Sequence, residues 1–305
     1  MDILTKIFVE IDDFVKEHKE ELKKRLISDG ISKRVRESRL SMSEIMTIIV
    51  YFHIAKFRTF KDYYLKYVSK YLKSAFPNLL SYKRFVNLKP KALLYLTAYM
   101  KFKRTKKCSG ISFIDSTTIK VCHNKRIASH KVFKGLAQRG KTSMGWFYGF
   151  KLHLVVNDRG EIINFLFTPG NVDDRDKEKV IDKITKGLFG KLFGDKGYLS
   201  KSLFNELYNR GIELITKIKK NMQNRLLPLI DKLLLRKRAI IETINDQLKN
   251  ISQLEHTRHR SYINAMVNWV SALIAYSYQP KKPSLNLTPY EKKVLDSNLL
   301  GLKRD

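Results

Sequence analysis

Three carboxylates stand out, because each lies where a site for phosphoryl transfer would need an acid. Asp115 ends a short apolar run, ISFID, and Asp195 ends a second one, KLFGD, while Glu242 lies on a segment with helical periodicity. If the two runs form neighbouring parallel strands, their ends bring the aspartates together, and a helix packed across that edge brings in Glu242. Three such acids repel one another unless cations neutralise them, as two Mg²⁺ ions about 4 Å apart would do.

The charge of the whole chain indicates a polyanionic partner. Its 305 residues include 60 Lys and Arg against 29 Asp and Glu, which gives a net charge of +31. The basic residues run through the whole sequence, so we expect a positive field that draws phosphates from a distance. A membrane surface would attract the same charge. However, segment 1–26 is an amphipathic charged helix unlike a signal peptide, and the apolar stretch 265–275 is too short for a bilayer. We expect a cytoplasmic protein that binds no membrane.

The first hundred residues have the pattern of a helical domain. Ser41 followed by Glu44 predicts a capping box at the start of a helix. Aromatic residues then recur at helical spacing, and we interpret them as a core face rather than as a platform for nucleic-acid bases; they are Phe60, Tyr64, Tyr67 and Tyr71. Segment 81–88 predicts a shorter helix that fits the second element of a helix-turn-helix motif.

A run of Lys and Arg over 101–107 marks the expected domain boundary. We predict an all-helical, DNA-binding domain over 1–107, a catalytic domain over 108–280 and a basic C-terminal tail over 281–305.

The period changes from helical to alternating at Ile111, which predicts a sheet. Strands are expected over 111–121, 147–156 and 161–167, then a helix near 180–184, a strand ending at Asp195, a helix over 201–209 and a strand over 212–218. This β-β-β-α-β-α-β order predicts the α/β class, as a mixed sheet with flanking helices, preceded by the helical domain.

The long connection 123–145 contains six basic residues and no acid. A connection of this length inside a compact sheet is uncommon unless it has a function, so we interpret it as a DNA-contacting loop rather than a solvated insertion. Its basic residues are Lys125, Arg126, Lys131, Lys134, Arg139 and Lys141. Arg238 and Lys249 flank Glu242 and are further candidates for DNA contact, although Arg238 and Glu242 taken alone indicate an ordinary surface ion pair.

Several other residues are better explained by structure than by chemistry. Asp173, Asp174 and Asp176 precede a predicted helix, so N-capping accounts for them more simply than metal binding. Trp146 and Trp269 are interpreted as core residues rather than as base-stacking side chains.

Five strings carry a resemblance to a known family: FIDSTTIKVC, GWFYGFKLHLVV, TPGNVDDRD, FGDKGYLS and RAIIETINDQLKN. They resemble the DDE transposases of bacterial insertion sequences, most nearly family 982, and the likeness extends over nearly the whole chain. It implies a ribonuclease-H-like catalytic domain that cuts at the element's ends and transfers the freed 3′ hydroxyl into target DNA. It also implies that Asp115, Asp195 and Glu242 are the catalytic metal ligands, for two Mg²⁺ ions or substituting Mn²⁺.

Further properties follow from the resemblance. It implies a dimer on DNA, because two element ends must be brought together, and association with the bacterial nucleoid during activity. A related group of transposases has Tyr, Arg, Glu and Lys on the last helix at fixed spacing. Arg238, Glu242 and Lys249 match that pattern, whereas Leu235 stands in place of the Tyr.

Three function classes remain open: a transposase, a plain metal-dependent nuclease with the same acids, and a catalytically inactive DNA-binding relative. A separate N-terminal DNA-binding region favours the first over the second, because strand transfer requires recognition of the ends. The intact set of three acids disfavours the third.

Overall fold

The computed structural model describes residues 2–28, 38–217, 227–255 and 259–293, and the chain forms two compact units. The first unit combines 1–104 with 247–279, and the second combines 105–246 with 280–305. No pattern in the sequence predicts that residues 247–279 belong to the same unit as the N-terminal residues. The functional division at 107 and 280 remains a prediction.

The first unit is helical throughout its described part, as the sequence predicts. Its helices are α1 (Ile3–Ser28), α2 (Met42–Ile54), α3 (Phe60–Asp62), the π-helical segment η1 (Tyr63–Val68), α4 (Ser69–Tyr71), α5 (Tyr82–Leu88), the short turn η2 (Lys89–Lys91), α6 (Ala92–Tyr99), the π-helical segment η3 (Met100–Arg104) and α11 (Tyr262–Ser277). Most of α11 is buried, including Trp269, so the core interpretation of that residue is confirmed. Within the described ranges, no helix is long and apolar enough to cross a bilayer.

The predicted capping box begins α2. Ser41 Oγ accepts a hydrogen bond from the Glu44 backbone N at 3.1 Å, and the Glu44 carboxylate accepts one from the Ser41 backbone N at 2.6 Å. These two contacts satisfy donors that the first turn of a helix leaves without partners. The prediction of a helix start at this position is confirmed.

The aromatic stripe is a core face over most of its length. Tyr64 is buried and its ring lies 4.8 Å from that of Phe85, whereas Tyr71 is 71% exposed. The core interpretation is therefore wrong for Tyr71. Residues 63–68 wind as a π-helix, which takes more residues per turn than an α-helix. The face consequently rotates along the segment, and Tyr63 enters the core instead.

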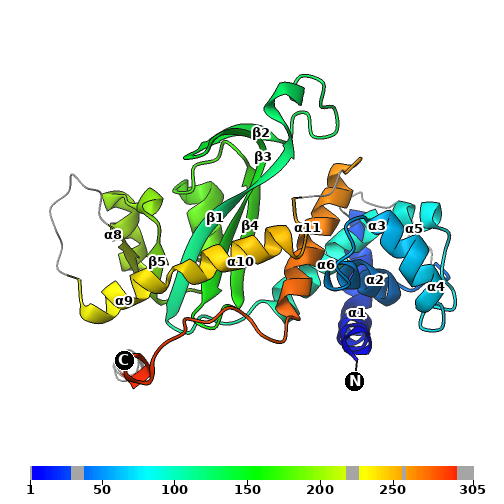
Figure 1. Cartoon of the computed structure of the whole chain (residues 1–305), viewed down its shortest axis with the longest axis horizontal. Helices are drawn as coiled ribbons and strands as arrows, with labels where there is room; N and C mark the ends of the chain where they lie inside the picture. Colours follow the sequence, from blue (N-terminus) through cyan, green and yellow to red (C-terminus); the bar gives the residue numbers. More distant parts are fainter. Residues whose placement is uncertain (1, 29–37, 218–226, 256–258, 294–305) are drawn as a thin grey trace. The chain divides into compact units, whose positions relative to one another are not determined.

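A six-stranded mixed sheet forms the centre of the second unit (Figure 1). Its strands are β1 (Ile111–Cys122), β2 (Gln138–Thr142), β3 (Gly145–Asn157), β4 (Ile162–Pro169), β5 (Gly190–Gly194) and β6 (Ile212–Thr216). β3 pairs antiparallel with β1, β2 and β4, and β5 pairs parallel with both β1 and β6. The expected α/β class, a mixed sheet with flanking helices, is confirmed.

The connection between the first two expected strands is partly regular, so its description as an irregular loop is wrong. After the short turn η4 (Asn124–Arg126), residues 138–142 form β2, which makes a hairpin with the start of β3 in the register Lys141↔Trp146. The remaining part is anchored by Phe133, which is buried and whose ring lies 5.8 Å from that of Phe150.

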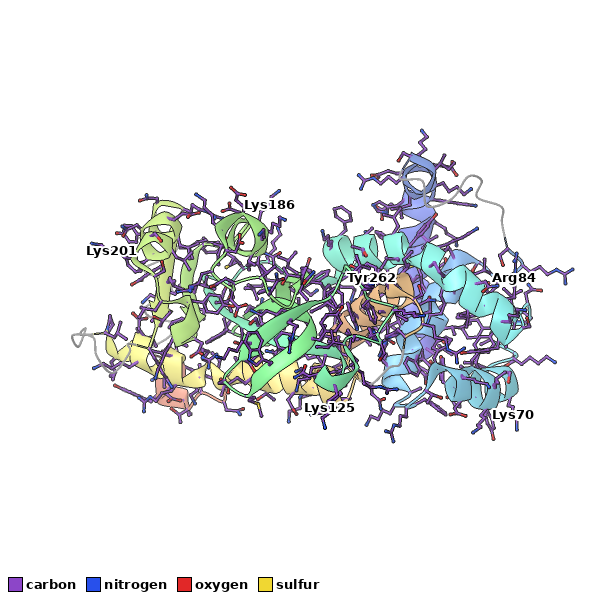
Figure 2. All side chains as sticks on the ribbon, turned by 90° about the horizontal axis from the view of Figure 1, so that it is seen from above. Lys70, Arg84, Lys125, Lys186, Lys201 and Tyr262 are labelled. Carbon is purple, nitrogen blue, oxygen red and sulfur yellow. The ribbon has the colours of Figure 1, made fainter. Side chains whose placement is uncertain are left out.

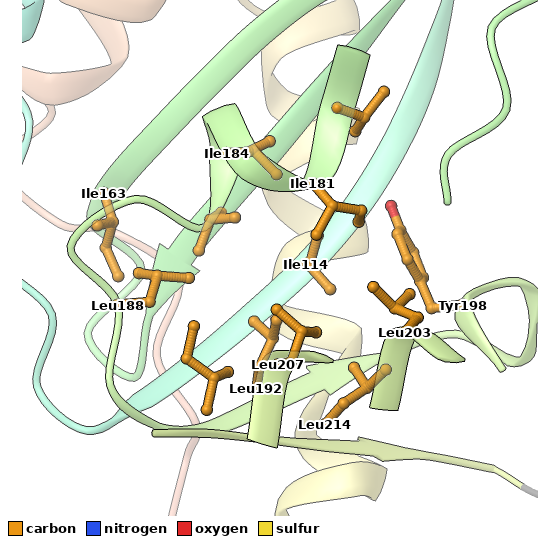
Figure 3. Packing of buried hydrophobic residues seen from close by; sticks show 13 residues of the cluster. Ile114, Ile163, Ile181, Ile184, Leu188, Leu192, Tyr198, Leu203, Leu207 and Leu214 are labelled. Carbon is orange, nitrogen blue, oxygen red and sulfur yellow. The ribbon is translucent and has the colours of Figure 1, made fainter. Parts of the chain in front are cut away.

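Helices cover both faces of the sheet. Segment η5 (Lys177–Ile181), α7 (Asp182–Ile184) and α8 (Lys201–Asn209) cover one face, where Ile114 of β1 packs in a cluster with Ile184 and Leu207 (Figure 3). A short turn, η6 (Lys196–Tyr198), follows β5. The other face carries α9 (Leu229–Lys237) and the first part of α10 (Ala239–Asn250), which crosses the sheet in Figure 1. Because side chains alternate along β1, residues on either side of Ile114 face this second layer.

Candidate active site

Asp115 and Asp195 come from adjacent parallel strands. β1 and β5 pair in the register Phe113↔Phe193, two residues before each aspartate. A Cβ atom on Gly194 would lie 3.3 Å from Ile114 Cγ2, so these two residues face the same core. The aspartates that follow them therefore point to the opposite face, which carries α9 and α10. This pairing is the one that the sequence predicted.

Glu242 is linked to Asp115 through a guanidinium. Arg238 forms an ion pair with Glu242, and its Nη1 lies 3.9 Å from Asp115 Oδ1. Asn245, one turn further along α10, donates from Nδ2 to Asp115 Oδ2 at 3.0 Å. The surface ion pair expected between Arg238 and Glu242 is thus present, but it also reaches the first aspartate. Asn245 was not among the candidates, although its position three residues after Glu242 places both side chains on neighbouring parts of one helix surface.

Arg238 is not part of the helix that carries Glu242. It lies between α9 and α10, as the residue that follows Lys237 at the end of α9. The sequence contains neither Gly nor Pro there, so the break has no local signal. Leu235, which stands in place of the Tyr found in related transposases, is buried in α9.

The acids of this site carry more negative charge than the guanidinium of Arg238 neutralises. The pKa of Asp115 is raised to about 6, mainly by burial and also by the charges of Glu242 and Asp195, against the lowering effect of Arg238. One guanidinium therefore compensates only part of the cost of ionising this carboxyl. A bound cation would stabilise its ionised form.

The donor chemistry fits a divalent metal, because carboxylate oxygens are the ligands that Mg²⁺ prefers. However, among the residues that the structure describes, no three His, Cys, Asp or Glu side chains are close enough together to hold a metal ion. Arg238 occupies the space between two of the acids. Asp195 and Glu242 are exposed, so their side chains are free to change rotamer at little packing cost.

A fourth acid, Asp174, contacts β1 and β3 and was misinterpreted from the sequence. Its Oδ2 accepts from Ser116 Oγ at 2.7 Å and its Oδ1 accepts from Lys151 Nζ at 2.9 Å. Asp173 instead forms an ion pair with Arg175, and Asp176 accepts from the Lys179 backbone N as a helix cap. The N-cap interpretation is therefore right for Asp176 and wrong for Asp174, which is held against β1 and β3.

Tyr198 contributes a buried hydroxyl to the same region. Burial raises the pKa of Tyr198 well above its ordinary value, and the charges of Asp174, Asp115 and Asp195 raise it as well. Its hydroxyl has no hydrogen-bond partner among the described residues. The sequence offered no signal for this residue other than its position three residues after Asp195.

The six basic residues of segment 123–145 are all exposed, and none of them forms an ion pair with a described acid. Lys249 is paired with Glu255 at 3.7 Å, within the first unit. Exposed basic side chains extend from each unit, for example Lys70 and Arg84 in the first and Lys125, Lys186 and Lys201 in the second (Figure 2). Both units thus present cations to solvent.

The sequence family is established by comparison with known proteins. Residues 105–262, just over half of the chain, match the family model of the transposase DDE domain. The chain belongs to this family. A DDE transposase domain therefore contains the sheet, both aspartates and Glu242.

The comparisons with curated proteins and with solved structures provide less information about the family. No curated protein matches the sequence. Among solved structures, the chain is similar to a piggyBac transposase in a synaptic complex with hairpin DNA, with 10% identity and a TM-score of 0.45. That likeness covers 97% of this chain and 77% of the other.

Proposed function

We propose that this transposase binds the ends of a bacterial insertion sequence and catalyses their metal-dependent cleavage and strand transfer. One observation carries the proposal: β1 and β5 pair in parallel so that Asp115 and Asp195 leave the same edge, while Arg238 ties Glu242 to Asp115. Three acids from two neighbouring strands and a covering helix can supply the carboxylate oxygens for a two-metal phosphoryl-transfer site.

Asp115, Asp195 and Glu242 would hold two Mg²⁺ ions, with Mn²⁺ able to substitute. When bound, the ions supply Lewis-acid stabilisation of the attacking and leaving oxygens. Asn245 fixes the rotamer of Asp115 by donating to it. Arg238, released from the acids, would bind the phosphate of the scissile strand as a bidentate donor.

Double-stranded DNA is the proposed partner, as element ends and as target. The net charge of +31 favours any polyanion, and the exposed basic segment 123–145 adds a local site within the catalytic domain. Helices of the first unit would recognise the ends, and a dimer would hold two ends together in the bacterial cytoplasm at the nucleoid.

A strand-transfer assay separates the candidate functions. It would combine the protein, Mg²⁺, labelled oligonucleotides that carry the ends of the element and a circular target. Joined product supports the transposase, cleavage without joining supports a nuclease, and binding without either supports an inactive DNA-binding relative. EDTA should abolish both chemical products.

The basic segment makes a separate prediction about affinity. Lys131→Gln combined with Lys134→Gln is expected to weaken DNA binding and to reduce the salt slope of log K by about 1 to 2, because each lost phosphate contact removes about one released counterion. Fluorescence anisotropy of a labelled duplex over a range of NaCl concentrations measures both quantities. The matched control is Lys186→Gln combined with Lys201→Gln, two exposed lysines elsewhere in the same unit. An unchanged slope in the first variant would remove this segment from the DNA interface.

A further inference from the structure

A cavity of about 450 Å³ lies in the second unit, at the β2–β3 hairpin. Its wall includes Arg139, Lys141 and Trp146 from the β2–β3 hairpin, together with Lys151, Asp174 and Gly197. This volume is in the range of small-molecule sites and suits a single nucleotide. The proposed function assigns no role to it.

Trp146 is exposed at the mouth of this cavity, contrary to the core interpretation from its sequence. Its side chain is 56% exposed, because the next residue, Phe147, alternates to the packed face of the hairpin. Lys141 lies directly opposite Trp146 in the ladder, and Arg139 lies two residues earlier on the same face. The Lys141 Nζ and the Arg139 guanidinium carbon lie 5.6 Å and 5.8 Å from the centre of the indole ring. Two cations thus lie close to one exposed aromatic ring.

The two cations are available to a ligand. Neither Arg139 nor Lys141 forms an ion pair with any acid among the described residues, and both are exposed. The other two basic residues of the cavity are occupied, since Lys151 binds Asp174 and Arg175 binds Asp173. Any anion that enters would therefore be held at the end of the cavity that carries Trp146.

The hairpin is held firmly in place. A Cβ atom on Gly140 would lie only 2.2 Å from the Gly170 carbonyl oxygen, so β2 approaches the 170 loop closely. Asn124 Nδ2 donates to the Trp146 carbonyl oxygen at 2.8 Å from the other side. The backbone that carries Trp146 is therefore anchored, which reduces the conformational entropy lost when a ligand stacks on the ring.

The cavity adjoins the segments that carry the two aspartates. Asp174 in its wall accepts a hydrogen bond from Ser116, the residue after Asp115. Gly197, also in the wall, is the second residue after Asp195. Because Ser116 and Asp115 alternate to opposite faces of β1, the cavity lies near these segments but is separate from the three acids.

We propose that the cavity binds an unpaired nucleotide of a DNA strand, with its base stacked on Trp146 and its phosphates bound by Arg139 and Lys141. This rests on the proposed function only in taking DNA as the substrate. Stacking on a side chain requires an open face of the base, which a base inside a duplex does not offer. Base–aromatic stacking combined with basic side chains is the usual way in which proteins hold single strands.

The test measures binding in EDTA, so that it does not depend on catalysis. Two probes are compared, a 20-nucleotide oligo-dT and a 20-base-pair dA·dT duplex. Trp146→Ala is expected to weaken binding of oligo-dT by roughly 5- to 100-fold, the range found when a stacking residue is removed, and to leave duplex affinity within about twofold. Trp146→Phe should retain most of the affinity for oligo-dT. Tyr208→Ala, at another exposed aromatic residue of the same unit, is the matched control and should leave both affinities unchanged.

Fluorescence provides a direct readout of stacking. The chain has two tryptophans, of which Trp269 is buried and Trp146 is exposed. Oligo-dT should quench the emission of the wild-type protein, and Trp146→Phe should lose this quenching. Absence of quenching, or equal loss of affinity for oligo-dT and duplex in Trp146→Ala, would overturn the proposal. Strand transfer by the wild-type protein is judged separately, so either idea can fail while the other stands.

Discussion

Asp115→Asn, Asp195→Asn and Glu242→Gln are each expected to reduce DNA cleavage and strand transfer by roughly 1,000-fold or more, because each removes a charged metal ligand from a site whose chemistry depends on bound cations. Each change is nearly isosteric. DNA affinity should therefore stay within about threefold of the wild-type value, since the many phosphate contacts of a strongly basic protein are untouched. The measurement is the strand-transfer assay together with duplex binding in EDTA.

The stability of these variants distinguishes a lost ligand from a misfolded protein. Burial raises the pKa of Asp115 to about 6, so at pH 7 the ionised carboxyl costs stability that a neutral Asn does not. Asp115→Asn should therefore unfold in EDTA at a temperature no lower than the wild type, while its activity is lost. Glu178→Gln, an exposed acid on η5, is the matched control and should keep full activity. Normal strand transfer by any one of the three variants would refute that residue's assignment.

Acidification from pH 7 to pH 4.5 is expected to destabilise the first unit, because it contains a buried neutral histidine, whereas a buried histidine and Asp115 act in opposite senses in the second unit. His53 in the first unit is held by Ser252 and Ser271, with distances of 2.7 Å from Nδ1 to the Ser252 carbonyl oxygen and 2.9 Å from Nε2 to Ser271 Oγ. Burial lowers the pKa of His53 to about 4, and it lowers the pKa of His153 in the second unit to about 4 as well.

The direction of this change in stability follows from the difference in proton binding between the unfolded and the folded protein. In the unfolded chain these groups take up a proton near the ordinary histidine pKa of 6.5, whereas the folded protein resists protonation until about pH 4. The stability that they contribute is thus complete above pH 6.5 and is lost as the pH falls towards 4, by about 2 to 3 kcal/mol for each histidine. In the second unit Asp115 acts in the opposite sense, because a raised carboxyl pKa favours the folded state as the pH falls.

Urea unfolding at pH 7 and at pH 4.5 measures this loss. His153→Gln should lose less stability on acidification than the wild type, since a glutamine amide keeps a donor for the contact that His153 Nε2 makes with Thr168 at 2.8 Å but does not titrate. His123→Gln, at an exposed histidine of the same unit, should leave the pH dependence unchanged. If the free energy of unfolding changes equally with pH in the wild type and in His153→Gln, then His153 does not cause the loss of stability.

The parts of the fold that local sequence determines were predictable. β1, β3 and β5 alternate or run apolar, so their limits were close to those observed, and the position of an aspartate after each run located the two acids. Ser41 and Glu44 identified a helix start because a capping box is made within four residues. Each of these features depends on neighbours in the chain.

The parts that depend on distant contacts were not predictable. β2 has the sequence QRGKT, with no apolar alternation, and it forms a strand because β3 offers it backbone partners. The sequence around Asp174 predicts a helix cap, whereas in the structure Ser116 and Lys151 donate hydrogen bonds to its carboxylate. Trp146 is exposed because of the hairpin register, which its own neighbours do not reveal. Contacts between residues that are distant in the sequence determined all three of these features.

The position of Arg238 has a consequence for the chain before it meets any substrate. A guanidinium keeps its positive charge at every physiological pH, and here it contacts two carboxylates that come from distant parts of the sequence. The folding chain therefore carries its own counter-ion, and Asp115 and Glu242 can come together without drawing one from solvent. Newly synthesised protein would then fold in the absence as well as in the presence of Mg²⁺.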